Sequence, residues 1–376
     1  PVYIIEKRNI VLKNQSNPSK IRAGIYLLAT FKYLRVIKMD RVIIKIYSRE
    51  QHISQILTGF IILKQEGKIN NLIIEKHYNA VCNMPNEHIV EVVLNREIII
   101  AYDVHDGYYF YKKEEKAKYD NYIEKVDFYF QRSYNESENK LLNEPDKIFP
   151  LGLNYFVSCN NNPLTKIDFQ SKNIHDFLAS IQRRIAGRNL YVENFEKDPS
   201  KTKNIPKIIF ITRTWGDRKL DDFRADCIRK LKKEYGSSCV AGFKATKDTL
   251  VNYPDCVLPK KITKKSNYLK LMRESDICIT TTGLHRSIGW KFAEYIAASK
   301  AIVTEKLNYS PGASLKVNEN FLEFETSEEL IKQVKKLVNN KKLLNNMKVL
   351  NSIYYKGYLK PEIIIWNSFK KVLEKF

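Results

Sequence analysis

The chain has 376 residues, of which 44% are hydrophobic and 28% are charged. This length allows two α/β domains with separate cores, and the absence of any run of about 18 apolar residues excludes a membrane-spanning helix as a prediction. The formal net charge is +22, and most of the excess is in the second half: residues 1–150 carry 23 basic and 19 acidic side chains, and residues 151–376 carry 41 and 23. A basic surface favours anionic partners such as nucleotides, lipid headgroups or nucleic acid. A genome biased towards Lys, Asn and Ile is an equally good explanation of part of this charge.

The cysteines form no pattern of a disulfide or metal site. They include no C-x-x-C pair and show no metal-ligand spacing with histidine. We therefore expect free thiols in a reducing cytoplasm and no bound metal. The six positions are 82, 159, 227, 239, 256 and 278.

Residues 1–40 leave three interpretations open. Residues 2–14 suit a hairpin, and residues 16–38 suit a basic helix with Ile25, Leu28 and Phe31 on one side. This helix lies on a membrane surface, or packs against the first domain, or precedes a natural start at Met39.

From Arg41 onwards, strands and helices alternate. Such alternation predicts a doubly wound parallel sheet. No G-x-G-x-x-G follows the first strand, which excludes a nicotinamide-binding fingerprint. The predicted strands are 41–48, 71–78, 88–95, 97–104 and 127–134, and the predicted helices are 49–68 and 114–126.

Polar residues follow the fourth of these strands in the sequence AYDVHDGYYF. Asp103, His105 and Asp106 would lie at the carboxyl end of the strand, where open α/β sheets bind ligands. A histidine beside carboxylates suits acid–base chemistry or contact with a hydroxyl group. The alternative is an ordinary pair on a surface loop.

The middle of the chain is typical of a connection between domains. Residues 147–156 contain Pro150 and Gly152, which favour a turn. An amphipathic helix is predicted at 174–187, followed by a polar, lysine-rich stretch at 196–206. The hinge is therefore expected within 151–206.

A second sheet is predicted from residue 207. A strand at 207–212 leads through a turn into a helix that begins near Leu220. A helix at 266–274 follows a cluster of lysines whose role is left unassigned: Lys260, Lys261, Lys264 and Lys265.

The pattern of residues 275–305 predicts a strand, a loop, a helix and a second strand. The first strand is 277–281, the loop 282–287 contains Gly283, the helix is 289–298, and the second strand is 301–304. Unpaired N–H groups and the helix dipole make such a helix start an anion site that suits a diphosphate. The rest of the chain predicts a strand, two helices and a last helix that opens at Pro361.

The segment AEYIAASKAIV resembles the donor-binding signature of GT-B glycosyltransferases, in particular the retaining group 1, or family 4, type of bacterial surface-polysaccharide biosynthesis. Glu294 falls on the second glutamate of that signature, and Gly289 falls on a loop glycine. Arg286 stands eight positions earlier, where the family has its first glutamate. The sequence VHD around His105 resembles a loop whose histidine faces the donor sugar, and Arg213 matches an arginine that grips the diphosphate.

The resemblance implies a GT-B fold: two Rossmann-like doubly wound domains face each other across a cleft, and a C-terminal helix crosses back to the first. The expected boundaries are an unassigned extension at 1–40, an acceptor-side domain at 41–160, a linker at 161–206, a donor domain at 207–360 and the crossover helix at 361–376.

The implied activity is that of a metal-independent hexosyltransferase. It moves sugar from a nucleotide-diphosphate donor, such as a UDP- or GDP-sugar, to a glycan or lipid-linked acceptor in cell-surface polysaccharide synthesis. We expect no other cofactor and a cytoplasmic protein, with peripheral attachment to the inner face of the plasma membrane as one option. The catalytic candidates are His105, Asp103 and Asp106, and the donor-binding candidates are Arg213, Arg218, Lys219, Gly283, Arg286, Ser287, Gly289 and Glu294.

Two other functions stay open. Arg286 in place of a glutamate motivates a catalytically silent GT-B-like protein that binds a glycan or a partner. The net charge alone motivates a nucleic-acid binder. Because no motif that interleaves aromatic and basic residues supports it, specific binding of nucleic acid is not expected.

Overall fold

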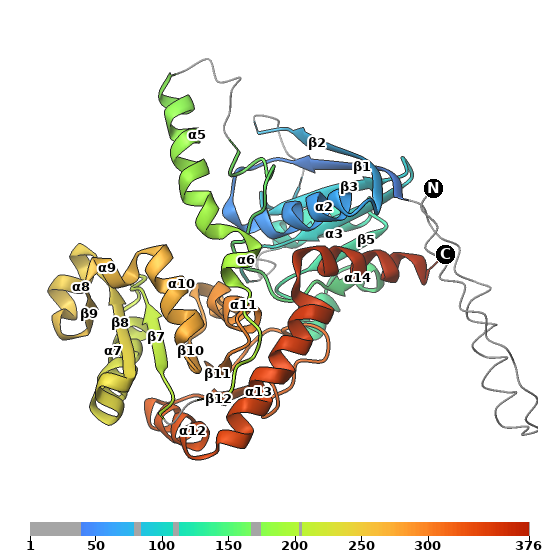
Figure 1. The fold of residues 1–376 in the computed structure, drawn as a ribbon. Coiled ribbons are helices and arrows are strands. Elements are labelled where there is room, and N and C mark those ends of the chain that lie inside the picture. The colour runs from blue at the N-terminus through green and yellow to red at the C-terminus, as the bar shows by residue number, and fades with distance from the viewer. Residues whose placement is uncertain (1–38, 79–83, 108–112, 167–173, 203–204, 376) are drawn as a thin grey trace, which may run out of the picture. The chain divides into compact units, whose positions relative to one another are not determined.

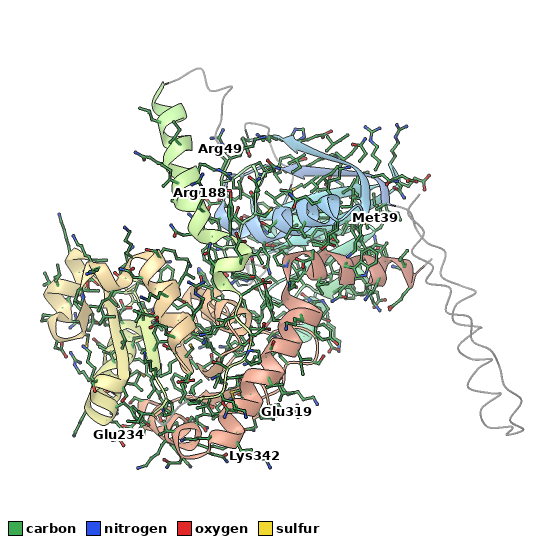
Figure 2. The ribbon with its side chains drawn as sticks, in the orientation of Figure 1. Met39, Arg49, Arg188, Glu234, Glu319 and Lys342 are labelled. Carbon is green, nitrogen blue, oxygen red and sulfur yellow. The ribbon has the colours of Figure 1, made fainter. Side chains whose placement is uncertain are left out.

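The computed structural model describes residues 39–78, 84–107, 113–166, 174–202 and 205–375 (Figure 1). Residues 39–376 form one compact unit, and Figure 2 shows its side chains from Met39 onwards. The elements predicted at 1–38 and Cys82 lie outside the described residues. The other five cysteines are free and buried, as predicted.

The first sheet has six strands in the order β2-β1-β3-β4-β5-β6. Helix α2 (Ser54–Gln65) connects β1 to β2, and α3 (Lys113–Ile123) precedes β5. Short helical turns at Gln51–Ile53, Glu136–Asn139 (α4) and Pro145–Lys147 complete this half. The strands are β1 (Met39–Ile46), β2 (Ile69–Lys76), β3 (Ile89–Leu94), β4 (Ile98–Asp103), β5 (Phe128–Gln131) and β6 (Ile148–Pro150).

Strand β3 corrects the prediction of a parallel first sheet. It runs antiparallel to both neighbours, β1 and β4. The cause is a tight hairpin: Asn95 and Arg96 have φ angles of 52° and 71°, and the backbone N–H of Glu97 donates to Leu94 O at 3.1 Å. Two consecutive left-handed residues are the signature of the two-residue turn that matches strand twist. As a result, the start of β3 lies at the same sheet edge as the ends of β1 and β4.

The segment between the sheets contains α5 (Ile174–Gly187), as predicted, and the short helix α6 (Val192–Phe195). A turn at Arg188–Leu190 separates the two helices.

The second sheet is entirely parallel, with the order β12-β11-β10-β7-β8-β9. Counted from β7, this is the Rossmann order, in which the direction of winding reverses between β7 and β10 and ligands bind at the carboxyl ends of those strands. The strands are β7 (Ile208–Thr212), β8 (Cys239–Lys244), β9 (Val257–Leu258), β10 (Ile277–Thr280), β11 (Ala301–Glu305) and β12 (Phe321–Phe324). The helices are α7 (Arg218–Tyr235), α8 (Lys247–Asn252), α9 (Lys260–Thr263), α10 (Lys265–Glu274), α11 (Trp290–Ala297), α12 (Ser327–Asn339) and α13 (Lys341–Tyr354), with short turns at Gly236–Ser238, Pro254–Cys256 and Leu284–Arg286.

The last helix, α14 (Pro361–Leu373), returns to the first sheet (Figure 1). It follows a π-helical turn at Tyr355–Leu359 and packs against α2. Gly59 of α2 allows this approach, since a Cβ atom there would lie 2.2 Å from the carbonyl oxygen of Pro361. The hydroxyls of Tyr102 and Ser368 also meet at 2.6 Å. Two Rossmann-like sheets with a returning C-terminal helix form the GT-B arrangement, so the predicted fold class is confirmed. The exact domain boundaries stay a prediction.

None of the helices in the described part of the chain combines the length and the hydrophobicity that crossing a membrane requires.

Candidate functional site

A cavity of about 920 Å³ is lined by residues that follow strands of both sheets. This volume is at the upper end of what small-molecule sites usually offer. The first-sheet half contributes His52, His88, His105, Asp106 and Arg132, and the second-sheet half contributes, among others, Arg213, Lys265, Tyr268, Gly283, Ser287, Gly289, Lys291 and Glu294.

The loop after β10 is a tight turn at the cavity wall. The backbone N–H of Gly283 donates to Ser287 O at 2.8 Å, and a Cβ atom at Gly283 would come within 2.9 Å of Ser287 Oγ. His285 and Arg286 have φ angles of 60° and 55°. Two adjacent left-handed residues without glycine are unusual and carry strain, and such strain concentrates at functional loops.

Helix α11 begins at this loop. Its N-cap, Gly289, offers no side-chain cap and lines the cavity. The first-turn N–H groups therefore have no capping side chain, as expected for an anion site. Phe292, Tyr295 and Ile296 are fully buried, and burial of large apolar side chains stabilises the helix position by roughly 1.5–3 kcal/mol each.

Buried Arg224 of α7 connects the loops that follow β7 and β10. Its guanidinium donates to Thr281 Oγ1 at 3.0 Å, Thr282 O at 2.7 Å and Arg213 O at 3.0 Å. Burial lowers the pKa of Arg224 to about 10, against the effect of nearby Asp221. Arg224 is thus a charged brace that fixes where Arg213 and the loop after β10 lie. The side chain of Arg213 stacks on the Trp215 ring, 3.6 Å from its centroid.

Glu294 lies buried at the centre of a charged cluster. Lys265 Nζ donates to one carboxylate oxygen at 2.7 Å, and Tyr268 Oη donates to the other at 2.6 Å. Burial alone would raise the pKa of the Glu294 carboxyl, but Lys265 and Lys291 hold it below its ordinary value. Glu294 is therefore an anion whose two oxygens already have partners.

Lys291, in the first turn of α11, lies over the Tyr268 ring, 4.0 Å from the centroid. Burial lowers the pKa of Lys291 to about 8, although the Glu294 charge raises it, and neighbouring cations lower it further. Together with Arg213, it places positive charge beside the helix start.

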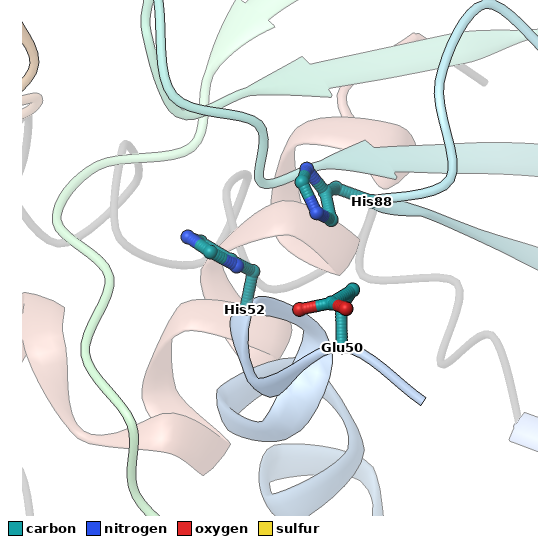
Figure 3. A group of neighbouring side chains, drawn as sticks. All are labelled: Glu50, His52 and His88. Carbon is teal, nitrogen blue, oxygen red and sulfur yellow. The ribbon is translucent and has the colours of Figure 1, made fainter. Parts of the chain in front are cut away.

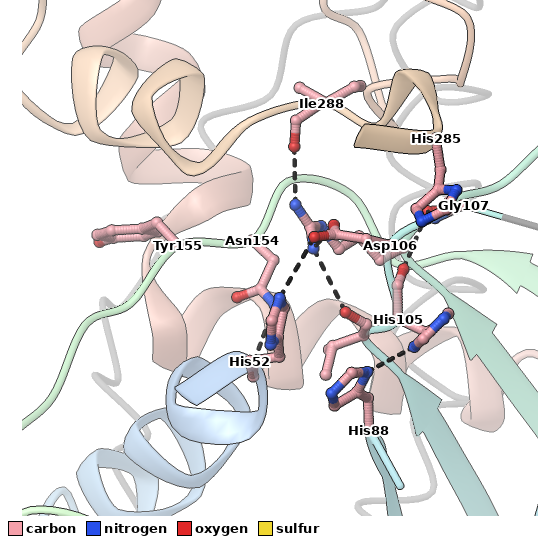
Figure 4. A network of polar contacts seen from close by, with 12 residues as sticks. His52, His88, His105, Asp106, Gly107, Asn154, Tyr155, His285 and Ile288 are labelled. Carbon is pink, nitrogen blue, oxygen red and sulfur yellow. Dashed lines mark hydrogen bonds and ion pairs between the residues drawn. The ribbon is translucent and has the colours of Figure 1, made fainter. Parts of the chain in front are cut away.

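The opposite wall holds three histidines. His52 follows β1 and lies beside His88 and Glu50 (Figure 3), and the His88 and His105 rings stack with centroids 4.7 Å apart. Their Nδ1 atoms are 2.5 Å apart, so one of them donates a hydrogen bond to the other. His52 Nε2 is 3.3 Å from Asp106 Oδ2, and Asp106 also forms an ion pair with Arg132 (Figure 4).

These contacts shift the pKa values of the ionisable side chains on this wall. Burial lowers the pKa of His88 to about 3, and the neighbouring His105 and His52 lower it further. Burial likewise lowers the pKa of His105. Burial raises the pKa of Asp106, but Arg132, His52 and His105 together outweigh this effect and hold it well below its ordinary range. At neutral pH this wall presents two neutral imidazoles beside one fixed carboxylate.

Direct contacts join the two walls. Arg132 Nη2 donates to Ile288 O at 2.7 Å (Figure 4), and the His52 and Trp290 rings pack edge to face at 4.8 Å. Gly107 lies against His285, where a Cβ atom would approach the His285 Cβ to 2.8 Å. The wall formed by His52, His88 and His105 thus directly contacts the loop that follows β10.

Among the sequence-predicted site residues, seven line the cavity: His105, Asp106, Arg213, Gly283, Ser287, Gly289 and Glu294. Asp103 lies behind the wall, where it accepts hydrogen bonds from Tyr129 Oη at 2.6 Å and from the His105 N–H at 3.0 Å. The other three are exposed and are not among the described lining residues: Arg218, Lys219 and Arg286. Arg218 also pairs with Asp222 at 3.5 Å. The functional roles predicted for all of these residues stay predictions.

Sequence reading missed several lining residues. Lys291 lies within residues 275–305, which were predicted as strand, loop, helix and strand. Its position one residue after the start of α11 could have identified it as a lining residue. The positions of His52, His88 and Arg132 depend on how separate strands meet, which no local motif contains. Lys265 was noted only as part of a lysine cluster.

We found no family model and no curated protein that matches the sequence. Solved structures do match it. S. aureus TarM, solved with fondaparinux, alpha-GlcNAc-glycerol and UDP, is 15% identical over 69% of this chain and 46% of TarM, with a TM-score of 0.40. Anabaena HepE with UDP is 12% identical over 72% of this chain and 71% of HepE, with a TM-score of 0.39. The pneumococcal O-GlcNAc transferase GtfA with UDP and GlcNAc is 13% identical over 72% of this chain and 49% of GtfA, with a TM-score of 0.40.

GtfA is described as an O-GlcNAc transferase, and the TarM, HepE and GtfA structures each contain UDP. This chain spans about half the length of TarM and of GtfA.

Proposed function

We propose that the protein is a glycosyltransferase that moves a hexose from a nucleotide-diphosphate donor, such as a UDP- or GDP-sugar, to a glycan or lipid-linked acceptor of a cell-surface polysaccharide. One observation carries the proposal. At the point where the second sheet reverses its winding, an uncapped helix start and fixed cations face a wall of histidines across one cavity. Ligands of open α/β sheets bind at such a point.

The diphosphate lies at the start of α11, over the loop that contains Gly283 and Ser287. Arg213 and Lys291 supply the positive charge that balances the departing nucleoside diphosphate. Cations fixed before the reaction stabilise developing charge without reorganisation. In this proposal, leaving-group departure needs no metal.

The sugar faces the first-sheet wall. His105 and the Asp106 carboxylate contact its hydroxyls or the attacking acceptor hydroxyl. Because Arg132 keeps Asp106 ionised, Asp106 accepts hydrogen bonds. His105, whose pKa is lowered by burial, is neutral near pH 7, so its imidazole can donate or accept a hydrogen bond.

A second candidate is a catalytically silent GT-B-like protein that binds a glycan or a partner. The contacts of Glu294 favour it. The family resemblance implies that Glu294 binds the ribose of the donor, but its carboxylate already accepts from Lys265 and Tyr268 and has less capacity for ribose hydroxyls. Arg286 in place of the first glutamate of the signature points the same way.

We place the reaction at the inner face of the plasma membrane. Support comes from the net charge of +22, since each basic residue near an anionic surface contributes about 1 kcal/mol of attraction. Retention on vesicles of anionic lipid, and release by salt, measures this part of the proposal.

Release of nucleoside diphosphate from UDP- and GDP-sugars tests the activity. We expect turnover by the wild type and a loss of about tenfold or more in Arg213→Ala, by analogy with the removal of a single charge-stabilising donor. Lys270→Ala is the matched control, because Lys270 is exposed on α10 and is not among the described lining residues. Nucleotide binding without turnover would select the silent protein.

A further inference from the structure

We propose that Glu50, His52 and His88 bind a divalent transition metal, with Zn²⁺ as the best fit, at the histidine wall of the cavity. The ligand atoms that these three side chains offer all lie within 4.8 Å of one another (Figure 3). Two imidazoles and one carboxylate form a recurrent zinc ligand set that leaves one coordination position open.

The fold explains why these residues converge. Glu50 and His52 flank the start of the short helical turn after β1. His88 directly precedes β3, whose Val90 pairs with Ile46 at the end of β1. Because β3 is antiparallel to β1, its first residue lies where β1 ends. His52 and His88 are therefore close in space although they are 36 positions apart in the sequence.

The hydrogen bonds of the two histidines identify the nitrogens that remain for a metal. His52 Nε2 faces Asp106 at 3.3 Å, and His88 Nδ1 faces His105 Nδ1 at 2.5 Å. Nδ1 of His52 and Nε2 of His88 are therefore the metal-binding atoms. His52 Nδ1 is buried and has no hydrogen-bond partner among the described residues. A buried nitrogen without a partner is costly, and a metal ion would satisfy it.

The surroundings match those of known metal sites. A metal-bound histidine almost always donates its other N–H to a carboxylate or another acceptor, which fixes the ring. Asp106, held by Arg132, serves His52 in this way, and His105 serves His88 (Figure 4). Each histidine thus has both a free ligand atom and an orienting partner.

The ligand chemistry narrows the choice of metal. Imidazole nitrogens favour Zn²⁺ and its neighbours in the first transition row over Mg²⁺ and Ca²⁺. In a tetrahedral zinc site the ligand atoms are roughly 3.3 Å apart. Exposed Glu50 has the side-chain freedom to close the remaining gap.

The metal would also set the role of His105. With the metal on Nε2, His88 keeps its proton on Nδ1 and donates a hydrogen bond through it to His105 Nδ1. The proton of neutral His105 is then on Nε2, so His105 acts as a hydrogen-bond donor there. This consequence depends on the proposed transferase function, whereas metal binding itself does not. The metal lies on the wall opposite the cations proposed to hold the diphosphate, so that part of the mechanism is unaffected.

Calorimetric titration of Zn²⁺ into tag-free, chelator-treated protein tests the site, without any nucleotide. We expect one equivalent per chain, and with Co²⁺ a visible absorption of a site with fewer than six ligands. His88→Gln should abolish the stoichiometric binding, and Glu50→Gln, at an exposed position that does not threaten folding, should weaken it about tenfold or more.

His77→Gln is the control. His77 also lies near a glutamate, with its Nε2 3.3 Å from Glu75 Oε2, but belongs to no three-ligand group in the described residues. It should bind Zn²⁺ like the wild type. Absence of stoichiometric binding by the wild type, or equal binding by His88→Gln, would overturn the metal site and leave the transferase proposal to its own assay.

Discussion

Glu294 shows how a single buried charge ties the donor site together. Its carboxylate is 4% exposed, with Lys265 on one oxygen and Tyr268 on the other. A buried ion pair adds little net stability, because desolvation offsets the attraction, but removal of one partner leaves a charge uncompensated. The contacts of this residue therefore give it a structural role.

Glu294→Gln is expected to lower the free energy of unfolding by about 1–3 kcal/mol, the cost of leaving buried polar groups without their partners. Urea denaturation measures it. Glu274→Gln is the control, because Glu274 forms only a loose surface contact with Lys207 at 3.9 Å, and such pairs contribute about 0–1 kcal/mol. Equal losses in the two variants would contradict the role of the Glu294 cluster.

Lys291 predicts a pH dependence of nucleotide binding. With a pKa of about 8, its ammonium is charged below that pH and neutral above it. Affinity for a nucleoside diphosphate should fall as pH rises through about 8, by roughly tenfold for the loss of one charged hydrogen bond. In the free protein the sign is opposite: the folded pKa lies below the ordinary value of 10.5, the unfolded chain binds more protons, and this group adds stability as pH rises from about 8 to 10.5.

Calorimetry at pH 6.5 to 9.5, a range chosen to bracket the shifted pKa, checks the binding profile. In Lys291→Met the affinity should be low at every pH, and in Lys270→Met it should follow the wild type. A flat profile for the wild type would remove Lys291 from the anion site.

At the scale of the elements, the hairpin that joins β3 to β4 decides which residues meet. The turn residues Asn95 and Arg96 are left-handed, and the antiparallel return of β3 brings His88 beside His105. The usual sequence signal of such a hairpin is Asn-Gly. Here an arginine takes the place of the glycine, so the turn was not recognised in the sequence. Because this hairpin was not predicted, the first sheet was expected to be parallel. In a parallel sheet, His88 would lie at the opposite edge of the sheet from His105.

Local motifs, by contrast, could be predicted well. The strand–loop–helix unit at 275–305 is contiguous in sequence, so its periodicity predicted α11, and the family signature placed Gly289 and Glu294 on it. The cluster of Glu50, His52 and His88 is built from two separate segments. Its detection requires the strand order and direction, which depend on long-range pairing rather than on local preference.

The docking of α14 on α2 gives a test at this scale. An alanine at Gly59 would place Cβ 2.2 Å from Pro361 O, so Gly59→Ala should destabilise the protein by about 1–3 kcal/mol through overpacking. Elsewhere in a helix, the same change stabilises by roughly 0.5–1 kcal/mol. At Gly357, where a Cβ atom meets nothing within 4 Å, alanine should be neutral or stabilising.

Thermal unfolding of both variants measures the difference. A Gly59→Ala protein as stable as Gly357→Ala would mean that α14 does not pack closely on α2 and that the C-terminal crossover is not a structural brace.

At the scale of the molecule, two sheets with different roles line one cavity. The second sheet offers positive charge and an uncapped helix start, and the first offers neutral histidines beside a carboxylate that Arg132 holds ionised. The length allowed two α/β domains, the family resemblance implied their arrangement, and the composition showed that the second half is the more basic. The sequence could not predict which cations line the cavity. Arg218, Lys219 and Lys291 are all basic residues near the start of a helix, and only the three-dimensional structure shows that Lys291 is the one that lines the cavity.

The most direct test of the account is a thermal-shift screen of the purified protein against UDP, GDP, CMP, ADP and dTDP, repeated with Lys291→Met. A ligand at about a hundred times its dissociation constant stabilises the fold by roughly 2.7 kcal/mol, which raises the melting temperature measurably. The account predicts a shift with one of these nucleotides that is strongly reduced by Lys291→Met and retained in Lys270→Met. A wild-type protein that none of them stabilises would contradict the nucleotide-sugar site.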